Sequence, residues 1–273
     1  MTNAIQLTTQ RYTHTKGLIA FDDLIAVESP MQIKLRTEGE APIDYAVLMR
    51  TPGEDRDLIT GLLFSESVIH APNDILQVQH IKETSEIDEY IVTLRDKTMM
   101  QELVKRNIAG HSGCGLCATD SAERLLQETY PVLPLKSGCL KPADLLQYRR
   151  YFLQGQTLFS RTGGSHATIL LDREGKVQLL KEDVGRHNAM DKAIGHCLQN
   201  TRLREIHLAL VSGRLSFEIV HKALKAGIGL LAGLGAPSSM AVELAYQNNL
   251  TLIGFLHNTK FNVYTHPLRL TKD

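Results

Sequence analysis

Hydrophobic and polar positions alternate with a two-residue period in part of the N-terminal third. Between residues 31 and 36 apolar side chains alternate with polar ones, which predicts a strand with one buried face. A polar turn over 38–40 and an apolar stretch over 45–50 predict a second strand, and 90–95 has the same character. The apolar residues of 58–63 fall on one helical face. This region therefore predicts a mixed sheet with one or two helices.

The second half of the chain has a different pattern, in which short apolar runs alternate with segments whose apolar residues recur at helical spacing. Strands and helices in alternation are typical of a layered α/β sheet with right-handed crossover connections. A helix that opens at Pro142 and stops at Gly155 precedes this alternation. The expected strands cover 168–171, 176–180, 206–211, 228–231 and 250–255, and the expected helices cover 188–198, 217–226 and 239–247.

The change of pattern divides the chain into regions. We predict a smaller mixed α+β domain over residues 1–110, a cysteine loop and connector over 111–135, and an α/β nucleotide- or cofactor-binding domain over 136–273. A length of 273 residues suits two domains. The fold class expected for the whole chain is α/β.

Composition narrows the range of partners and compartments. Thirty basic and thirty acidic residues leave no net charge, so a general binder of nucleic acid or of anionic membranes is not indicated. Residues 1–16 lack the apolar core of a signal peptide, and the uncharged stretch 226–242 is broken by glycines and Pro237, so no membrane span is expected. With four cysteines and no secretion signal, we expect a reducing, cytoplasmic location.

The main chemical motif is His111-Ser-Gly-Cys114-Gly-Leu-Cys117. Its glycines predict a small exposed loop, and Asp120 and Glu123 after it have the spacing of a helix capping box. A thiol just before a helix N-terminus lies near the positive end of the helix dipole, which favours the thiolate. The sequence therefore predicts nucleophilic cysteines.

Other interpretations of this motif are weaker. A structural zinc site needs a second cysteine or histidine pair, and the other two cysteines, Cys139 and Cys197, each stand alone. A thioredoxin-like CxxC lies near the start of its domain, whereas this one lies mid-chain. A zinc deaminase carries a glutamate two residues after the histidine, where this chain has Gly113. No metal site is expected.

The connections that follow the expected strands carry the candidate binding residues. In open α/β sheets such connections gather at one edge and build the ligand site. Glycines let backbone N–H groups approach a phosphate, and arginine supplies a forked cation. Serines stand at helix N-termini, where anions bind, and Asp183 could accept hydrogen bonds from guanine. Each residue taken singly also fits an ordinary cap or turn. The candidates are Thr162, Gly163, Gly164, His166, Asp183, Gly185, Arg186, His187, Ser212, Arg214, Ser216, Ser238 and Ser239.

The ordered set of motifs resembles the FdhD family, the sulfur carriers required for formate dehydrogenase activity. The resemblance runs from about Asp22 to the C-terminus. It implies a cytidine-deaminase-like three-layer C-terminal domain without the deaminase zinc, in a cytoplasmic homodimer. It is carried by Gly113-Cys-Gly-Leu-Cys117, Thr162-Gly-Gly-Ser-His-Ala167, Glu182-Asp-Val-Gly-Arg-His187, the stretch 211–226 and Leu250-Thr-Leu-Ile-Gly-Phe255.

The resemblance also implies a mechanism and its ligands. A cysteine desulfurase would place sulfur on Cys114 as a persulfide, with Cys117 as a second carrier or assisting thiol. The acceptor would be the molybdenum bis(molybdopterin guanine dinucleotide) cofactor of a formate dehydrogenase, which GDP would mimic. The alternative is a cofactor-binding chaperone whose two cysteines bind zinc or stiffen a loop. The implied cofactor-binding segment is Phe255, Leu256, His257, Asn258, Thr259 and Lys260.

Overall fold

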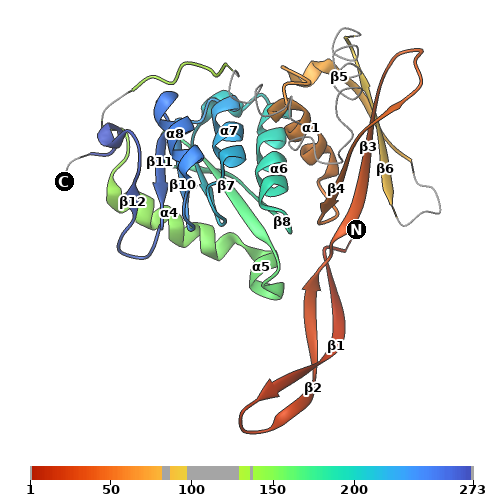
Figure 1. Ribbon diagram of the computed structural model, residues 1–273, viewed down its shortest axis with the longest axis vertical. Coiled ribbons are helices and arrows are strands. Elements are labelled where there is room, and N and C mark those ends of the chain that lie inside the picture. Colours follow the sequence, from red (N-terminus) through yellow and green to blue (C-terminus); the bar gives the residue numbers. More distant parts are fainter. Residues whose placement is uncertain (1, 82–86, 97–128, 136–137, 272–273) are drawn as a thin grey trace.

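The computed structural model describes residues 2–81, 87–96, 129–135 and 138–271. In these residues the chain forms a two-stranded ribbon, a four-stranded sheet and a six-stranded sheet, with helices between them (Figure 1). The strands are β1 Ala4–Thr13, β2 Gly17–Ala26, β3 Ser29–Thr37, β4 Ile43–Arg50, β5 Ile75–Ile81, β6 Asp88–Leu94, β7 His166–Asp172, β8 Val177–Asp183, β9 Ile206–Val211, β10 Leu230–Gly233, β11 Thr251–Gly254 and β12 Asn262–Val263. The helices are α1 Asp55–Ser65, α4 Pro142–Gly155, α5 Thr157–Thr162, α6 Arg186–Gln199, α7 Phe217–Lys225 and α8 Ser239–Gln247, with short 3₁₀ turns at Pro72–Asp74, Leu203–Glu205 and Pro267–Arg269.

The six-stranded sheet has the order β12-β11-β10-β9-β7-β8. Strands β9, β10 and β11 are parallel, and β7 runs antiparallel to both β9 and β8. Strand β8 therefore points the same way as β9. The carboxyl ends of β8 to β11 and the beginning of β7 lie along a single edge of the sheet.

Both faces of this sheet are buried. Along β9, Ala209 and Val211 belong to a core that includes residues of α6, α7 and α8, whereas Leu208 and Leu210 belong to a second core that includes Leu145 and other residues of α4. Helices thus cover the sheet on two sides (Figure 1). The predicted layered α/β class is confirmed. The closer likeness to cytidine deaminases stays a prediction.

Helix α1 joins the N-terminal sheet to the helical layer of the C-terminal sheet. The backbones of α1 and α6 lie in direct contact, because each helix presents a glycine to the other. A Cβ at Gly61 would lie 1.9 Å from the carbonyl oxygen of Asp191, and one at Gly195 would lie 2.0 Å from that of Asp57. The strands of the order β4-β3-β6-β5 pack on α1, and their buried residues belong to the same core as α6. The proposed domain boundaries stay a prediction.

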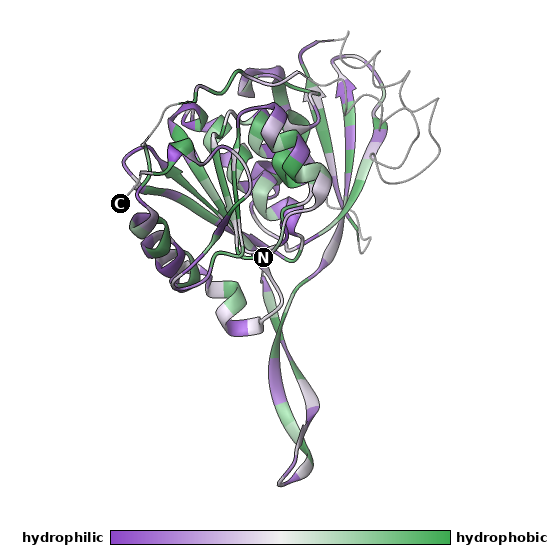
Figure 2. Ribbon diagram, turned by 60° about the vertical axis from the view of Figure 1, so that its left-hand side comes forward, coloured by the Kyte–Doolittle hydropathy of each residue, from purple (hydrophilic) through white to green (hydrophobic). Residues whose placement is uncertain are grey.

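The ribbon β1–β2 was not expected from the sequence. Its strands pair without a break from Ala4↔Ala26 to Thr13↔Gly17. It projects from the body as an arm (Figures 1 and 2), along which both apolar and polar side chains are exposed. In the described residues no helix is long and apolar enough to cross a membrane.

Candidate functional site

Five connections meet at the edge where β8 to β11 end and β7 begins, and hydrogen bonds join neighbouring connections. Gly235 donates its backbone N–H to the carbonyl oxygen of Gly213 at 3.3 Å, and Phe255 donates to Gly235 at 3.1 Å. On the other side, Ser212 donates to the carbonyl oxygen of Ala167 at 3.0 Å. The predicted candidates from Thr162 to Lys260 are therefore brought to one edge, which we call the loop edge.

Asp183 lies beneath the loop edge rather than at its surface. Its carboxylate is fully buried. Oδ2 accepts from Lys192 Nζ at 2.7 Å and from the Thr51 backbone at 3.2 Å. Oδ1 accepts from Gly185 at 2.9 Å and from Asn188 Nδ2 at 3.0 Å. Both oxygens are thus occupied, so the direct contact with guanine expected from the sequence is not supported. Asp183 holds its loop in place.

Thr51 and Lys192 were missed by sequence reasoning. Thr51 Oγ1 accepts from the Val184 backbone at 3.1 Å, and its carbonyl oxygen accepts from Lys192 Nζ at 2.9 Å. The only local signal was Thr51-Pro-Gly, which indicates a turn before a helix and nothing about a loop more than 130 positions away. The N-terminal part of the chain therefore fixes the loop that carries Gly185, Arg186 and His187.

His166, at the beginning of β7, faces the connection after β9. Its Nδ1 lies 3.1 Å from Ser212 Oγ, which also accepts from the Ala167 backbone at 2.9 Å. Burial lowers the pKa of His166, and the positive charge of Arg186 and the neighbouring His187 lower it further. Near neutral pH this imidazole is therefore a hydrogen-bonding group rather than a cation.

Arg186 carries a buried donor without an acceptor. Its Nε has no hydrogen-bond partner among the described residues. Gly213 lets the side chain pass close to the backbone, because a Cβ there would lie 3.2 Å from Arg186 Cδ and 3.4 Å from His166 Nδ1. Buried donors in native proteins normally find a partner. An anionic ligand oxygen at the loop edge would satisfy this one.

His187 forms a pair with Glu218 of α7. Its Nε2 lies 2.7 Å from Glu218 Oε2 and 3.3 Å from Ser216 Oγ. The hydrogen bond from His187 lowers the pKa of Glu218. In a Ser-His-acid triad the serine and the carboxylate contact different ring nitrogens, whereas here both contact Nε2. The group therefore does not have the geometry of a serine hydrolase.

Some predicted polar residues act as local caps. Ser238 Oγ accepts from the Ala241 backbone at 3.3 Å at the start of α8, whereas Ser216 leads α7 without such a bond. Thr162 Oγ1 donates to Leu158 at 2.8 Å, and Gly163 ends α5 with a left-handed φ of 67°. Arg214, Ser239 and Gly164 are exposed and remain available to a ligand.

The segment 255–260 forms the outer end of the loop edge. A hollow of about 280 Å³ is lined by Phe255, His257, Lys260 and Asn262. Leu256 is buried, so only its backbone can meet a ligand. Arg149 of α4 supports the segment from behind, donating to the Leu256 carbonyl oxygen at 3.0 Å and to Asn258 Oδ1.

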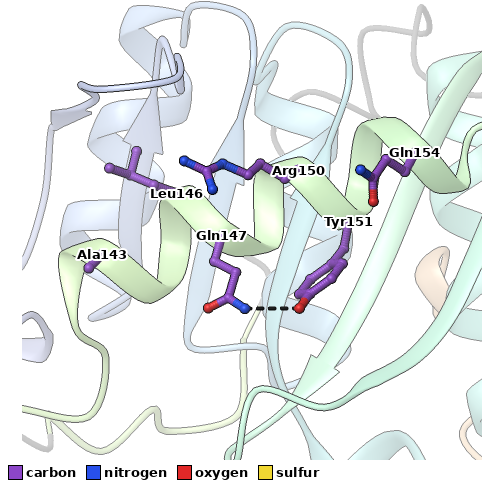
Figure 3. Close-up of a pocket in the computed structure, with 6 residues that line it drawn as sticks. All are labelled: Ala143, Leu146, Gln147, Arg150, Tyr151 and Gln154. Atoms are coloured by element: carbon purple, nitrogen blue, oxygen red, sulfur yellow. Dashed lines mark hydrogen bonds between the residues drawn. The ribbon is translucent and has the colours of Figure 1, made fainter.

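A second hollow, of about 470 Å³, runs along the outward face of α4 (Figure 3). Gln147 Nε2 donates to the Tyr151 hydroxyl at 2.9 Å across this face. All its lining residues come from one helix, and the candidate residues of the loop edge are absent from it. The hollow is lined by Ala143, Leu146, Gln147, Arg150, Tyr151 and Gln154.

The expected nucleophiles, Cys114 and Cys117, lie outside the described residues. Of the two cysteines that the structure describes, Cys197 is buried, and burial raises its pKa to about 11. It is therefore a poor nucleophile at neutral pH. Within the described residues, no three histidine, cysteine, aspartate or glutamate side chains are grouped to hold a metal ion.

Glu182 is a further residue that sequence reasoning missed. Its carboxylate accepts from the backbone N–H groups of Leu158 and Phe159 at 2.8 Å each and from Ser165 Oγ at 3.0 Å. A carboxylate at a helix N-terminus is favourable, and here it also fixes the turn that leads to His166.

Comparison with known proteins agrees with the motifs. The sequence model of the FdhD/NarQ family matches residues 26–271. The chain is 36% identical over 250 residues to the sulfur carrier protein FdhD of Saccharolobus solfataricus, covering 91% of each. It is 37% identical over 257 residues to that of Nocardia farcinica, covering 93% of this chain and 90% of the relative. A crystal structure described as a formate dehydrogenase accessory protein from Desulfotalea psychrophila shares the fold, with a TM-score of 0.75 over 99% of this chain and 100% of its own at 23% identity.

Proposed function

Because the chain belongs to the FdhD/NarQ family, we propose that it is a sulfur carrier, or sulfurtransferase, for a formate dehydrogenase. It would accept sulfur as a cysteine persulfide and transfer it to the molybdenum bis(molybdopterin guanine dinucleotide) cofactor of that enzyme. The observation that carries the proposal is the loop edge, where five connections meet around cationic and glycine-rich positions.

The loop edge would bind the guanine ends and phosphates of the cofactor, which is a substrate here. The unpartnered Nε of Arg186 suits a phosphate oxygen, and Gly213 lets the Arg186 side chain lie close against the backbone. Arg214 and Lys260 are exposed cations at the same edge. Lys260 is a point charge and lacks the forked geometry of arginine, so its contact is less directional. GDP would mimic the guanine end of the cofactor.

The sulfur relay uses ordinary thiolate exchange. The Cys114 thiolate attacks the terminal sulfur of a desulfurase persulfide, a new S–S bond forms, and the desulfurase cysteine leaves as a thiolate. Cys114 then carries the persulfide. Cys117 can take over the terminal sulfur by the same exchange, with Cys114 as the leaving thiolate. Delivery follows when the free thiolate of the pair attacks the sulfur of the carrier cysteine, so that a Cys114–Cys117 disulfide forms, sulfide leaves to the bound cofactor, and the two thiols supply the two electrons.

The proposal implies partners and a compartment. A cysteine desulfurase donates the sulfur, a formate dehydrogenase receives the finished cofactor, and the carrier is a homodimer. No nucleic acid, membrane or intrinsic metal takes part. A cytoplasmic location suits the chemistry, because free thiols persist in a reducing compartment.

Mass spectrometry after incubation with a desulfurase and cysteine tests the relay. We expect one added sulfur on the peptide with Cys114, its loss in Cys114→Ala, and its retention in Cys117→Ala. Sulfur found on Cys117 in the Cys114→Ala variant would reverse the assignment. Sulfur on neither cysteine, with stoichiometric zinc that is lost in Cys114→Ser, would instead favour a cofactor-binding chaperone with a zinc-binding CxxC.

A further inference from the structure

The β1–β2 arm lies outside the part of the chain that the family model describes. That model begins at residue 26, where β2 ends, so nearly the whole arm precedes it. The ten strand pairs span about 33 Å, and a two-stranded ribbon is only marginally stable alone in water. In the described part of the chain no third strand pairs with the arm. The arm therefore completes neither of the two larger sheets.

The base of the arm adjoins the loop edge. A Cβ at Gly164 would lie 3.4 Å from the Cβ of Ala26, and Gly164 is one of the exposed candidate residues of the loop edge. Strand β2 also lies against α5, the helix that leads to this glycine. From there the arm extends beyond α5, at the end of the molecule where β7 begins (Figure 1). A protein that covers the loop edge on this side therefore meets the arm.

The end of the arm has a defined shape. A turn over residues 14–16 joins the two strands, and Gly17 after it has a φ of 66°, in the left-handed region that favours glycine. Lys16 donates its backbone N–H towards the Thr13 carbonyl oxygen at 3.3 Å and Thr13 Oγ1 at 3.2 Å. The tip is therefore ordered before it meets a partner, which lowers the entropy cost of binding.

Two apolar side chains next to this turn are exposed. Tyr12 and Leu18 are cross-strand neighbours, so they project from the same face of the ribbon, and they are 67% and 66% exposed. On the opposite face the Arg11 guanidinium lies over the Phe21 ring, 3.2 Å from its centroid, and covers it. Tyrosine and arginine are enriched in protein interfaces. The face with Tyr12 and Leu18 is therefore the one left open to a partner.

The outer half of the arm is also positively charged. Residues 9–21 include Arg11, His14 and Lys16 and contain no aspartate or glutamate, although the whole chain has equal numbers of basic and acidic residues. The acidic side chains of the arm, Asp22 and Asp23, lie nearer to its base. A surface complementary to the tip therefore combines an apolar patch with acidic groups around it.

We propose that the arm tip docks on the enzyme that receives the sulfurated cofactor, at an acidic surface of that enzyme whose apolar centre takes Tyr12 and Leu18. The inference rests on the proposed function and names the surface that the acceptor enzyme meets. Because the arm begins beside the loop edge, an enzyme held by the tip lies next to the bound cofactor. Because the arm precedes the region described by the family model, it selects the particular formate dehydrogenase that this chain serves.

Interferometry with an immobilised formate dehydrogenase of the source organism, purified without its molybdenum cofactor, tests the docking. We expect Leu18→Ser to raise the dissociation constant about tenfold or more, mainly through faster dissociation. Lys16→Glu should lower the association rate and weaken its dependence on salt, because it removes an attractive charge. Leu268→Ser is the matched control, since Leu268 is 63% exposed near the C-terminus, and it should bind like the wild type.

The outcomes separate this inference from the proposed function, once an unchanged urea midpoint confirms that each variant is folded. Wild-type kinetics in both Leu18→Ser and Lys16→Glu, or an equal loss in Leu268→Ser, would overturn the docking. Wild-type binding to phosphatidylglycerol vesicles that is lost in Leu18→Ser would also overturn it, because the tip would then bind lipid. Sulfur gain on Cys114, measured by mass, tests the relay separately: gain without enzyme binding removes only the docking, and no gain removes the relay.

Discussion

The loop edge has an inner layer and an outer layer, which differ in burial and in hydrogen bonding. The inner layer, with Asp183, Lys192 and Thr51, is buried, and each polar group has a partner. The outer layer, with Arg214 and Lys260, is exposed, and these two side chains have no hydrogen-bond partner among the described residues. Stability therefore resides in the inner layer and ligand affinity in the outer one, so mutations can separate the two properties.

The largest effect is expected from the buried pair. Lys192→Met leaves the Asp183 carboxylate buried without its cation, which costs about 3–5 kcal/mol of unfolding free energy. Urea denaturation measures the loss. Lys260→Met is the matched control in the outer layer and should change stability by no more than about 0.5 kcal/mol. Equal losses in the two variants would erase the distinction between layers.

An intermediate effect is expected on binding. Arg214→Lys removes the forked donor while keeping the charge, so the dissociation constant for GDP should rise roughly tenfold, about 1.4 kcal/mol, with the unfolding free energy unchanged. Calorimetric titration measures this, and ATP should bind the wild type more weakly than GDP. Arg150→Lys on the outward face of α4 is the control. If it weakens GDP binding equally, the loop edge is not the nucleotide site.

The smallest effect concerns pH. The hydrogen bond from His187 holds the pKa of Glu218 below its ordinary 4.5, so the ionised carboxylate stabilises the fold above that value. This contribution is lost as pH falls through the lowered pKa. We expect Glu218→Gln to lower the Tm by about 1–2 °C at neutral pH and by progressively less toward about pH 3. Glu243→Gln, at an exposed position of α8, should show no such trend. A Glu218→Gln difference that widens in acid contradicts the assignment.

Elements with a continuous buried pattern could be predicted from sequence. The strand 206–211 and the helix 239–247 were predicted residue for residue, because packing in the core imposes a regular spacing of apolar residues on each element. The arm was not predicted because polar residues such as Arg11 and Asp23 interrupt its apolar face. Helix α5 was missed because it has only six residues and its first turn is held by Glu182 of another element.

The position of the loop edge was predictable, but its layering was not. The rule that strand ends share an edge correctly brought the candidates from Thr162 to Lys260 together. Local sequence cannot reveal that Asp183 faces inward, since its partner Thr51 lies 132 positions away and Lys192 lies on the following helix. Partners so distant in sequence become apparent only in the folded chain. The roles of Cys114 and Cys117 stay predictions.

The glycine contact between α1 and α6 determines the mechanics of the molecule. Gly61 and Gly195 bring the two helix backbones together with no side chain between them. Sliding or tilting of packed helices proceeds through small rearrangements of intervening side chains, and at this crossing point the backbones leave no space for any. The glycine contact therefore resists movement of one sheet relative to the other. Adaptation to a large, flat ligand falls to the connections at the loop edge, and alanine at either glycine would force the helices apart and loosen both sheets at once.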